Sequence, residues 1–418
     1  MKVLVVGNGG REHALAWTLL QSANVEQVIC TPGNGGTAVM DNCLNLAIAV
    51  DDFAGIAQAV REQDVSLVVV GPEVPLSLGI VDYLQQQNIA TFGPTQAGAK
   101  IESSKSWAKE IMVQANVPTA QAASFTDLAT AQAYIQQVGA PIVVKADGLA
   151  AGKGVIVAMT EAEAIAATAE LFTANSSKLV IEEFLTGSEV SVLAVTDGKT
   201  IRPLSPAQDH KRIGEGDTGK NTGGMGAYSP VPLVTDELMT KIEQEVLQPT
   251  LAALKQRNID YRGILYAGLM ITPQGEPKVI EFNCRFGDPE TQVVLPLLAT
   301  PLDQIFLACI TQKLEQLPPF TWKSGSAVCI VAASGGYPDA YTKGKTISGI
   351  AQAEAKGALV FHAGTKLEQQ VLTDGGRVLG VTALGDDFTS AVAIAYDALK
   401  SIQFTDMYYR RDIGYQYR

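Results

Sequence analysis

The hydrophobic positions in the first hundred residues form short apolar runs, separated by stretches with helical spacing. KVLVV, QVICT and VSLVVV are runs of the kind found in strands that are buried on both faces. Stretches such as DDFAGIAQAVREQ repeat apolar residues every three or four positions, as an amphipathic helix does. Strands and helices that alternate in this way build βαβ units. The pattern predicts a Rossmann-like N-terminal domain with a parallel sheet over residues 1–103.

The pattern becomes more mixed after this region. Residues 122–188 contain the strand-like runs PIVVK, VIVAM and KLVIEEFL together with two helical stretches, one of which opens with a capping box at Thr160 and Glu163. A long helical stretch and two further strands, GILYAGLMIT and PKVIEFNCRF, come later. We expect one domain over residues 104–320, within which residues 122–188 form a subdomain.

Two segments complete the organisation of the chain. Residues 205–230 are dense in glycine and charge, which predicts a long loop, and a loop of this length inside a compact domain is commonly functional. Past residue 320, AVCIVAAS, VFHAGTKL and RVLGVTALG predict strands that precede one helix. We expect a small α+β domain over residues 321–418, so the fold class is α/β and α+β, multidomain.

Composition and charge narrow the classes of partner. The 418 residues include 43 acidic and 31 basic side chains, a net charge of −12, whereas a nucleic-acid or anionic-membrane surface needs a basic face. The five cysteines form no C-x-x-C pair, which argues against a disulfide framework or a zinc site. No apolar run has the length of a membrane span. We expect a cytoplasmic protein with small-molecule substrates, and neither nucleic acid nor a membrane as partner.

The segment VVKADGLAAGKGVIVAM places lysines on both sides of a glycine-rich turn. It does not match a P-loop, because Gly148 and Gly152 are one residue too close and Gly154 replaces the hydroxyl residue that binds magnesium. A P-loop also opens a helix, whereas VIVAM predicts a strand. We interpret the segment as a flexible hairpin that carries Lys153 near its tip.

A second glycine turn, NGGRE, lies between the first predicted strand and the first helix, where helix amides can meet an anion. Glu12 takes the place of the third glycine of a dinucleotide fingerprint, and no acidic residue ends the second strand, so NAD is disfavoured. A smaller phosphorylated ligand fits better; the alternative is a tight turn that binds nothing. The residues available to such a ligand at this sheet edge are Asn8, Gly9, Gly10, Arg11 and Glu73.

The clearest chemical signal is VIEFNCRFGDPE, in which Glu281, Asn283 and Arg285 share one face of a predicted strand. A carboxylate and an amide oxygen side by side suit magnesium, and the arginine could hold a carboxylate or a developing charge. The alternative is an edge strand with a polar outer face. Lys145 ends the apolar run PIVVK, where a charge needs a reason, whereas Lys105 alone is typical of a solvated surface lysine.

VIEEFLTGSEV predicts a strand that leaves into a turn. One interpretation is an ordinary strand end with solvated acidic side chains. The other is a hinge whose backbone reads an adenine edge, at Glu182, Glu183 and Leu185, while Glu189 accepts ribose hydroxyls.

Taken in order, these segments resemble the ATP-grasp superfamily. VVGNGGREHALAW, KADGLAAGKGVIVAM, QDHKR, NTGGMGAYSP, VIEFNCRFGDPETQ and VFHAGTKL are, more narrowly, similar to segments of the glycinamide ribonucleotide synthetases (phosphoribosylamine–glycine ligases). The similarity runs from Met1 to RRDIGY near residue 415. It implies an ATP-grasp fold for residues 104–320, with residues 122–188 as its flap subdomain.

The resemblance implies ATP-dependent ligation of glycine to 5-phospho-D-ribosylamine through glycyl phosphate, in de novo purine biosynthesis. ATP would be a co-substrate, and Mg²⁺ or Mn²⁺ the cofactor. The residues it assigns to ATP are Lys105, Lys145, Gly148, Gly152, Lys153, Gly154, Glu182, Glu183, Leu185 and Glu189. Those it assigns to the metal are Glu281 and Asn283; to catalysis, Arg285, Asp209 and Lys211; and to the substrates, Asn8, Gly9, Gly10, Arg11, Glu73, Gly224 and Met225.

One short stretch departs from the pattern of the wider superfamily. Many members carry an acidic metal ligand on the strand before the E-x-N strand, where this sequence has Tyr266, Ala267 and Gly268. The number of metal ions, one or two, is therefore open. Two alternatives also stay open: an ATP-grasp ligase with other substrates, such as a biotin carboxylase-like enzyme, and a nucleotide-binding sensor without turnover. We expect a monomer that makes at most a transient contact with the enzyme that supplies phosphoribosylamine.

Overall fold

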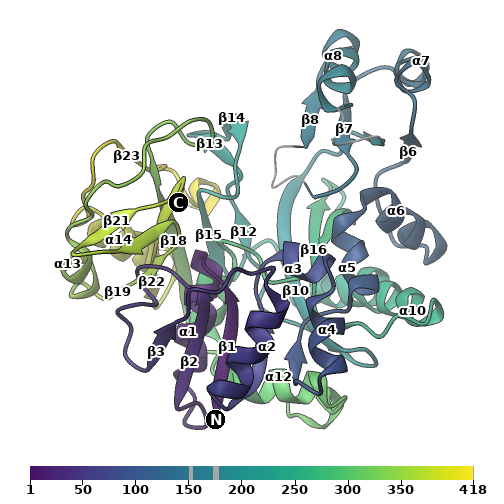
Figure 1. Ribbon diagram of the computed structural model, residues 1–418. Coiled ribbons are helices and arrows are strands. Elements are labelled where there is room, and N and C mark those ends of the chain that lie inside the picture. Colours follow the sequence, from purple (N-terminus) through teal and green to yellow (C-terminus); the bar gives the residue numbers. More distant parts are fainter. Residues whose placement is uncertain (150–153, 173–177, 418) are drawn as a thin grey trace.

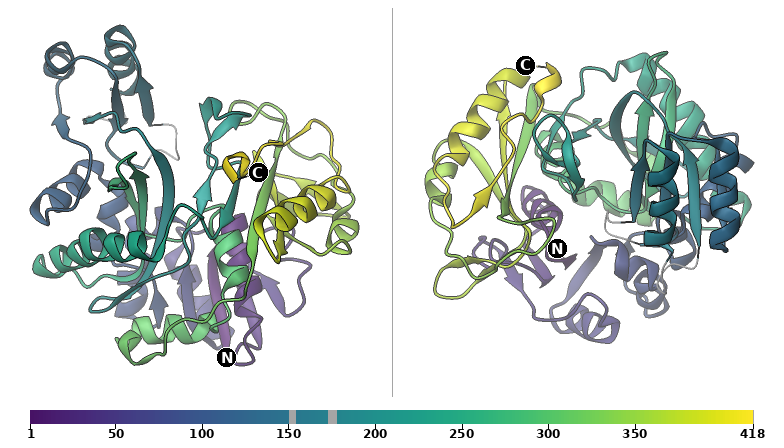
Figure 2. Two further views of the ribbon diagram at one scale, coloured as in Figure 1. Left: turned by 180° about the vertical axis from the view of Figure 1, so that it is seen from behind. Right: turned by 90° about the horizontal axis from the view of Figure 1, so that it is seen from above.

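The computed structural model describes residues 1–149, 154–172 and 178–417. Its strands form four sheets of at least four strands and two two-stranded ribbons. The described part of residues 122–188, which we call the flap lobe, stands apart from the C-terminal sheet. The N-terminal and central sheets lie below and between these two parts (Figures 1 and 2). Among the described residues, no helix combines the length and apolarity needed to cross a membrane.

The N-terminal region is a parallel sheet in the order β3-β2-β1-β4-β5, as the alternating pattern predicted. Residues 3–6 of its middle strand are fully buried, which is why this strand shows an unbroken apolar run instead of alternation. The strands are β1 (Lys2–Gly7), β2 (Gln27–Pro32), β3 (Cys43–Asn45), β4 (Val65–Val70) and β5 (Thr91–Phe92). The helices are α1 (Gly10–Leu19), α2 (Phe53–Glu62), α3 (Glu73–Ser77), α4 (Ile80–Gln86) and α5 (Gln96–Ser103).

The strand order reverses at β1, which pairs with β2 on one side and with β4 on the other. In parallel α/β sheets, ligands bind beyond the carboxyl ends of the strands at such a point. The glycine turn before α1 and Glu73 at the start of α3 follow β1 and β4, so both lie at this edge.

The central region is an antiparallel sheet in the order β11-β10-β16-β17. Its two long strands meet along ten register pairs and supply much of the buried core. The strands are β10 (Ser188–Asp197), β11 (Ile201–Pro203), β16 (Arg262–Ile271) and β17 (Pro277–Asn283). The helices are α6 (Lys105–Gln114), α9 (Asp236–Ile242), a π-helical turn (Glu243–Leu247), α10 (Gln248–Gln256), α11 (Thr291–Leu297) and α12 (Leu302–Ile310).

The flap lobe is a small antiparallel sheet, β6-β9-β7-β8, with two helices and an apolar cluster of its own. The predicted capping box is present: Thr160 and Glu163 each accept a hydrogen bond from the other's backbone N–H at the start of α8. The elements are β6 (Ala122–Phe125), α7 (Leu128–Val138), β7 (Ile142–Ala146), β8 (Val155–Ala158), α8 (Glu161–Leu171) and β9 (Leu179–Glu183).

The C-terminal sheet has the order β12-β15-β18-β22-β19, with β23 also on β18. Its strands are β12 (Gln208–Asp209), β15 (Gly226–Ser229), β18 (Ser326–Ser334), β19 (Ala358–His362), β22 (Arg377–Gly385) and β23 (Met407–Tyr408). Around it lie the ribbon β20 (Thr365–Leu367) and β21 (Val371–Thr373), α13 (Ile350–Glu354), α14 (Phe388–Leu399), and 3-10 turns at Leu314–Gln316 and Tyr415–Tyr417.

The segment 205–230 differs from the long loop that the sequence predicts. It contains β12, the hairpin of β13 (Arg212–Gly214) and β14 (Thr218–Asn221), and β15. The reason is pairing with a distant strand: β15 has little local strand signal, yet it pairs along its length with β18, a hundred residues further on. Two strands from the central part of the sequence thus belong to the C-terminal sheet, across the boundary predicted near residue 320.

Candidate active site

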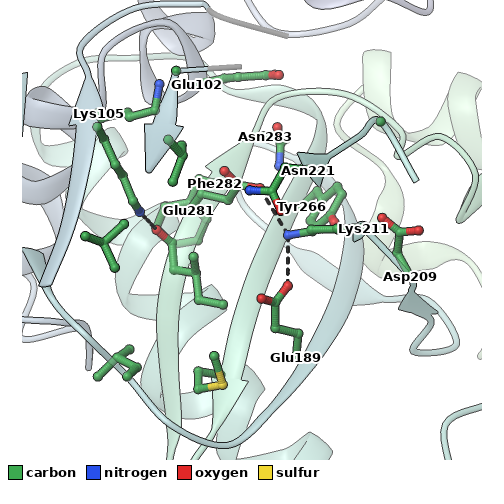
Figure 3. Close-up of a pocket in the computed structure, with 18 of the residues that line it drawn as sticks. Glu102, Lys105, Glu189, Asp209, Lys211, Asn221, Tyr266, Glu281, Phe282 and Asn283 are labelled. Carbon is green, nitrogen blue, oxygen red and sulfur yellow. Dashed lines mark hydrogen bonds and ion pairs between the residues drawn. The ribbon is translucent and has the colours of Figure 1, made fainter. Parts of the chain in front are cut away.

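A cavity of about 880 Å³ is lined by residues from the N-terminal edge, α6, the flap lobe, the central sheet, the 208–223 segment and the C-terminal sheet. Figure 3 shows part of it, with Glu281 and Asn283 on β17 and Lys105 and Asp209 on opposite sides. Side chains that are far apart in the sequence therefore meet in one space. The question is what their charges and contacts can do.

The floor of the cavity is β17, whose predicted alternation is interrupted by a β-bulge. Gly268 pairs with Glu281 but Leu269 pairs with Val279, which leaves Ile280 as the extra residue. The carbonyl of Ile280 accepts a hydrogen bond from Lys145 Nζ at 3.0 Å. The bulge thus helps to fix Lys145 beside Glu281.

Lys145 is the penultimate residue of β7 and is 4% exposed. Its Nζ lies 3.1 Å from Glu182 Oε2, and Lys109 Nζ lies at the same distance from that oxygen. Lys109, four residues after Lys105 on α6, is a cation that the sequence analysis missed although it repeats with helical spacing. The charge that the sequence left unexplained at the end of PIVVK is therefore held in a buried cluster.

Lys105 is the first residue of α6, and its Nζ donates to the carbonyl oxygen of Gly148 at 2.8 Å. Gly148 and Gly154 both line the cavity, as do the hinge residues Glu183 and Leu185. The other two predicted flap residues, Gly152 and Lys153, lie outside the described residues.

Lys211 lies between two carboxylates, as Figure 3 shows. Its Nζ is 3.1 Å from Glu189 Oε2 and 3.7 Å from Glu281 Oε1. Burial would lower the pKa of Lys211, but these carboxylates raise it well above its usual range. Lys211 therefore stays a cation and ties the 208–223 segment to the central sheet.

Glu281 is the centre of the charge arrangement. Burial favours a raised pKa for its carboxyl, but Lys211, Lys145, Lys105 and Arg285 outweigh burial and hold the pKa below its usual range. One carboxylate therefore faces four cationic side chains from separate parts of the chain. Cations gathered in this way can neutralise a ligand with several negative charges.

Arg285 follows β17 and reaches three side chains. Its Nη2 donates to Glu102 Oε1 at 2.9 Å and to Asn283 Oδ1 at 3.1 Å, and its Nε lies 3.4 Å from Glu73 Oε2. Burial works against its charge, but Glu102 and Glu73 raise its pKa. Glu102, on α5, carries no sequence signal that would have identified it.

Asp209 lies on the opposite side of the cavity, on β12. Its Oδ1 is buried and has no hydrogen-bond partner among the residues that the structure describes. Burial, together with the charge of Glu290, raises the pKa of Asp209 well above its usual range. This carboxyl therefore retains a proton to a higher pH than an ordinary aspartic acid.

Glu290 also lines the cavity, and the sequence analysis did not identify it. Its Oε1 accepts hydrogen bonds from Tyr266 Oη at 2.6 Å and from Ser191 Oγ at 2.9 Å. Tyr266, on β16, thus fixes a carboxylate that comes from the segment after β17.

The C-terminal region adds a wall that the sequence did not predict. Arg377 Nη2 lies 3.4 Å from Asp288 Oδ1, and its Nη1 donates to the carbonyls of Asp288 and Gly223. Tyr337 Oη accepts a hydrogen bond from Gly223 N at 3.0 Å. The cavity residues next to this wall come from the 208–223 segment and from the end of the chain: Arg212, Asp217, Asn221, Thr222, Tyr415 and Gln416.

At the N-terminal edge, backbone N–H groups of the glycine turn already donate to carboxylates of this chain. Glu12 Oε2 accepts from Gly9 N at 2.7 Å, and Asp288 Oδ2 accepts from Arg11 N at 3.4 Å, so carboxylates already meet these helix amides. Arg11 pairs with Glu12 and lines the cavity, as does Glu73. The predicted Asn8, Gly9 and Gly10 are not among the lining residues.

Two further predicted substrate residues also lie behind the cavity wall. Met225 is fully buried, and neither it nor Gly224 is among the lining residues, whereas Gly223 is. Gly224 has a φ of +110°, and a Cβ there would lie 2.5 Å from Asp209 Oδ1. This glycine therefore allows the chain to pass close to Asp209.

The residues predicted to hold a metal lie close together. Glu281 and Asn283 offer one carboxylate and one amide oxygen, hard donors that suit a divalent cation with phosphate oxygens and water in its remaining positions. The described residues contain no group of three or more His, Cys, Asp or Glu side chains placed to hold a metal without other ligands. The donor set thus fits an ion that arrives with a nucleotide.

Comparison with known families covers most of the chain. Residues 1–102 match the N domain of phosphoribosylglycinamide synthetase, residues 103–291 its ATP-grasp (A) domain and residues 327–416 its C domain.

Individual relatives agree with this assignment. The chain is 64% identical to the phosphoribosylamine–glycine ligase of Nostoc sp., over 100% of this chain and 99% of that one. It is 50% identical to the trifunctional purine biosynthetic protein adenosine-3 of Gallus gallus, over 99% of this chain and 42% of that one.

Solved structures give the same result. The phosphoribosylamine–glycine ligase of Thermotoga maritima matches with a TM-score of 0.84 and 32% identity, over 99% of this chain and 100% of that one. Biotin carboxylase of Campylobacter jejuni, at 14% identity, shares the fold with a TM-score of 0.73, over 98% of this chain and 92% of that one. The chain therefore belongs to the phosphoribosylglycinamide synthetase family, whose central domain is an ATP-grasp domain.

Proposed function

We propose that this cavity activates glycine at its flap side and forms the amide bond at the side of the 208–223 segment. The chain is an ATP-grasp ligase that joins glycine to phosphoribosylamine and so makes glycinamide ribonucleotide in purine biosynthesis. The observation that supports our division of roles is the meeting of Lys105, Lys145 and Lys211 around Glu281.

The nucleotide would lie between the flap lobe and β17. Lys105 and Lys145 bind its phosphates, and Lys153 adds a charge when the flap closes. The backbone around Glu182, Glu183 and Leu185 reads the adenine edge, and Glu189 accepts the ribose hydroxyls. Gly148, Gly152 and Gly154 let the flap backbone approach the phosphates.

Glu281 and Asn283 would hold one or two Mg²⁺ or Mn²⁺ ions, which supply charge neutralisation for the phosphates when they are bound. Glu281 is already ionised in the folded chain because four cations lower its pKa. The carboxylate can therefore serve as a ligand without first losing a proton.

In the first step a carboxylate oxygen of glycine attacks the γ-phosphorus of ATP. A P–O bond forms, the bond to the leaving ADP breaks, and glycyl phosphate results. Two anions must approach one another, and a unit charge pair at 4 Å is worth about 4 kcal/mol at an effective dielectric of 20, so each nearby cation matters. Lys105, Lys145 and Arg285 supply this neutralisation in our proposal.

In the second step the amine of phosphoribosylamine attacks the carbonyl carbon. The C–N bond forms, the C–O bond to phosphate breaks, and the nitrogen loses one proton. Asp209 is our candidate to accept that proton, because a carboxylate with a raised pKa is a stronger base than an ordinary one. Lys211 steadies the leaving phosphate.

The phosphoribosyl part would lie toward the N-terminal edge, against Arg11 and Glu73. In this proposal the turn of Asn8, Gly9 and Gly10 carries Arg11 into place, and Gly224 and Met225 support the backbone that brings Gly223 to the wall. Closure of the flap keeps water from the acyl phosphate, which would otherwise hydrolyse.

ADP release measured with glycine, with and without freshly generated phosphoribosylamine, tests the reaction. We expect sustained ADP release only with both substrates. Sustained release with bicarbonate, or binding of ATP with no turnover for any acid and amine, would favour another ligase or a sensor and would contradict the proposal.

A further inference from the structure

Residues 407–416 lie against the back of the segment that carries the β13–β14 hairpin. We propose that these residues, which we call the buttress, position the hairpin for the amide-forming half of the reaction, with Arg410 as the positioning residue. This inference rests on the proposed function for the identity of the substrates. The family resemblance extends into this segment at RRDIGY but assigns none of its residues a role.

Arg410 is the centre of the contact. Its side chain is 0% exposed, which is rare for a guanidinium and requires that its donors be paired. Nη1 donates to the carbonyl of Arg212 at 3.0 Å and to Asp217 Oδ1 at 2.7 Å. Nε and Nη2 each donate to Asp412, both at 2.8 Å. One planar fork thus joins the hairpin to the buttress.

Other contacts follow the hairpin residue by residue. Tyr408 Oη donates to the carbonyl of Ile213 at 2.7 Å, and Gly216 N donates to Asp412 Oδ2 at 2.7 Å. Tyr415 Oη donates to Asp217 Oδ2 at 3.1 Å. The series of contacts begins just before the hairpin, where Gly414 N donates to His210 Nε2 at 3.1 Å. The hairpin is therefore held from behind along its first strand and its turn.

The hairpin and its flanks also carry residues that line the cavity, among them Lys211, Arg212, Asp217 and Asn221. Thr222 N donates to the carbonyl of Lys211 at 2.8 Å, so the base of the hairpin fixes the lysine that lies between Glu189 and Glu281. Tyr415 and Gln416 also line the cavity. The buttress thus both aims the hairpin and contributes to the wall.

The nucleotide side has different supports. Lys145 is held by Glu182 and the carbonyl of Ile280, and Lys105 by the carbonyl of Gly148; these partners belong to the flap lobe and β17. In Figures 1 and 2 the hairpin lies between the flap lobe and the C-terminal sheet and is separate from β7 and β8. A loosened buttress should therefore disturb glycine and phosphoribosylamine before it disturbs ADP.

The test compares Arg410→Lys, which keeps the charge but loses the fork, with Tyr415→Phe, which removes one hydroxyl from an exposed side chain. Tyr83→Phe, the same chemical change on α4, is the matched control. For each protein we would measure kcat, the KM values for glycine and phosphoribosylamine, the dissociation constant of ADP, and the rate of tryptic cleavage after Lys220 in β14.

We expect Arg410→Lys to lose about 10- to 100-fold in kcat/KM for the two substrates, because small misplacements of substrate-holding groups cost this much. Tyr415→Phe should show a smaller loss in the same direction. Cleavage after Lys220 should be faster in both, while ADP binding and Tyr83→Phe should match the unchanged protein.

Unchanged KM values in Tyr415→Phe, or ADP binding that weakens in parallel with KM, would overturn the proposal, since the segment would then only stabilise the fold. This holds even if Arg410→Lys fails to fold. Absence of ADP release from the unchanged protein with both substrates would instead reject the proposed function, and the cleavage assay would still report whether residues 407–416 hold the hairpin.

Discussion

The two sides of the cavity are built in different ways. On the flap side, cations are fixed by groups of the flap lobe and of β17, as Lys145 on β7 is by Glu182 on β9 and by the carbonyl of Ile280 on β17. On the opposite side, guanidinium groups from the C-terminal region reach far along the chain, as Arg377 does to Asp288 and Arg410 does to Asp217. The first side depends on how the flap lobe meets β17, and the second depends on the sheet that joins the central and C-terminal regions.

Burial disfavours charge on both sides, but it acts on groups of opposite sign. Burial lowers the pKa of Lys105 and Lys109, so these cations gain from a bound anion. Burial raises the pKa of Asp209, so that carboxyl retains its proton to a higher pH. The comparison teaches that one side is arranged to receive negative charge and the other to take up or release a proton.

The largest effect is expected on the flap side. Lys145→Ala and Glu281→Ala should each lower the rate of ADP formation by about 10³-fold or more, because each removes a preorganised charge at the phosphates. Glu182 keeps its pair with Lys109 in Lys145→Ala, so the fold should survive. Lys241→Ala, which removes an exposed pair with Glu276, is the control. Turnover near that of the control in either variant would remove that residue from the mechanism.

Asp209→Asn tests the proton-accepting side, and we expect a loss of about 100-fold in kcat. The pKa of Asp209 is raised, so activity that needs its carboxylate should increase with pH through that raised pKa. The asparagine variant should lack this rise because it has no group to titrate. A pH–rate profile in which the same acidic limb persists would show that another group accepts the proton.

Arg377→Lys sharpens the comparison between the two sides. It should raise the KM for glycine or phosphoribosylamine about tenfold, since one charge remains but the contacts to Asp288 and Gly223 are lost. The dissociation constant of ADP should not change. Glu189→Gln should show the reverse, a weaker nucleotide with little effect on the other substrates. Equal effects of both variants on ADP would break the distinction.

The last effect is on stability and not on activity, at the contact between the N-terminal and C-terminal regions, where His13 Nδ1 accepts a hydrogen bond from the backbone N–H of His362 at 2.8 Å. Burial, reinforced by His362, lowers the pKa of His13 from 6.5 to about 3. Below pH 6.5 the unfolded chain binds a proton that the folded chain rejects. As the pH is lowered below 6.5, the free energy of unfolding should therefore fall by about 1.4 kcal/mol for each pH unit because of this group alone.

His13→Gln should make this fall less steep between pH 6 and pH 4, as measured by urea unfolding at several pH values. At pH 8 the variant and the original chain should differ mainly by the lost packing. An unchanged slope would mean that His13 does not carry the pH dependence.

The sequence predicted the flap side better than the other side, for a physical reason. The local pattern along a strand was enough to identify Lys145, Glu281 and Asn283, because a strand fixes which neighbours share a face. Arg377 and Tyr415 reach the cavity only through pairing of β15 with β18 and through the contacts of Arg410. Such pairings between distant segments leave no mark in a local pattern.

The same reasoning explains three smaller differences. The sequence showed that Glu12 breaks the dinucleotide fingerprint but not that its carboxylate caps the turn at Gly9. The segment 205–230 has weak strand signals, so it was predicted as a loop, and the structure stabilises it by partners from β18 onward. The bulge at Ile280 was equally invisible, since it arises from register between two strands.

One measurement bears most directly on the meeting of cations around a phosphoryl group and the carboxylate of glycine. Glycine labelled with ¹⁸O in both carboxylate oxygens would be turned over with ATP and phosphoribosylamine, and the released phosphate analysed by mass. We predict that each phosphate carries one ¹⁸O atom, because a glycine oxygen attacks the γ-phosphorus and leaves with it. Phosphate without label, with the lost ¹⁸O atom found in water or in ADP instead, would contradict the account.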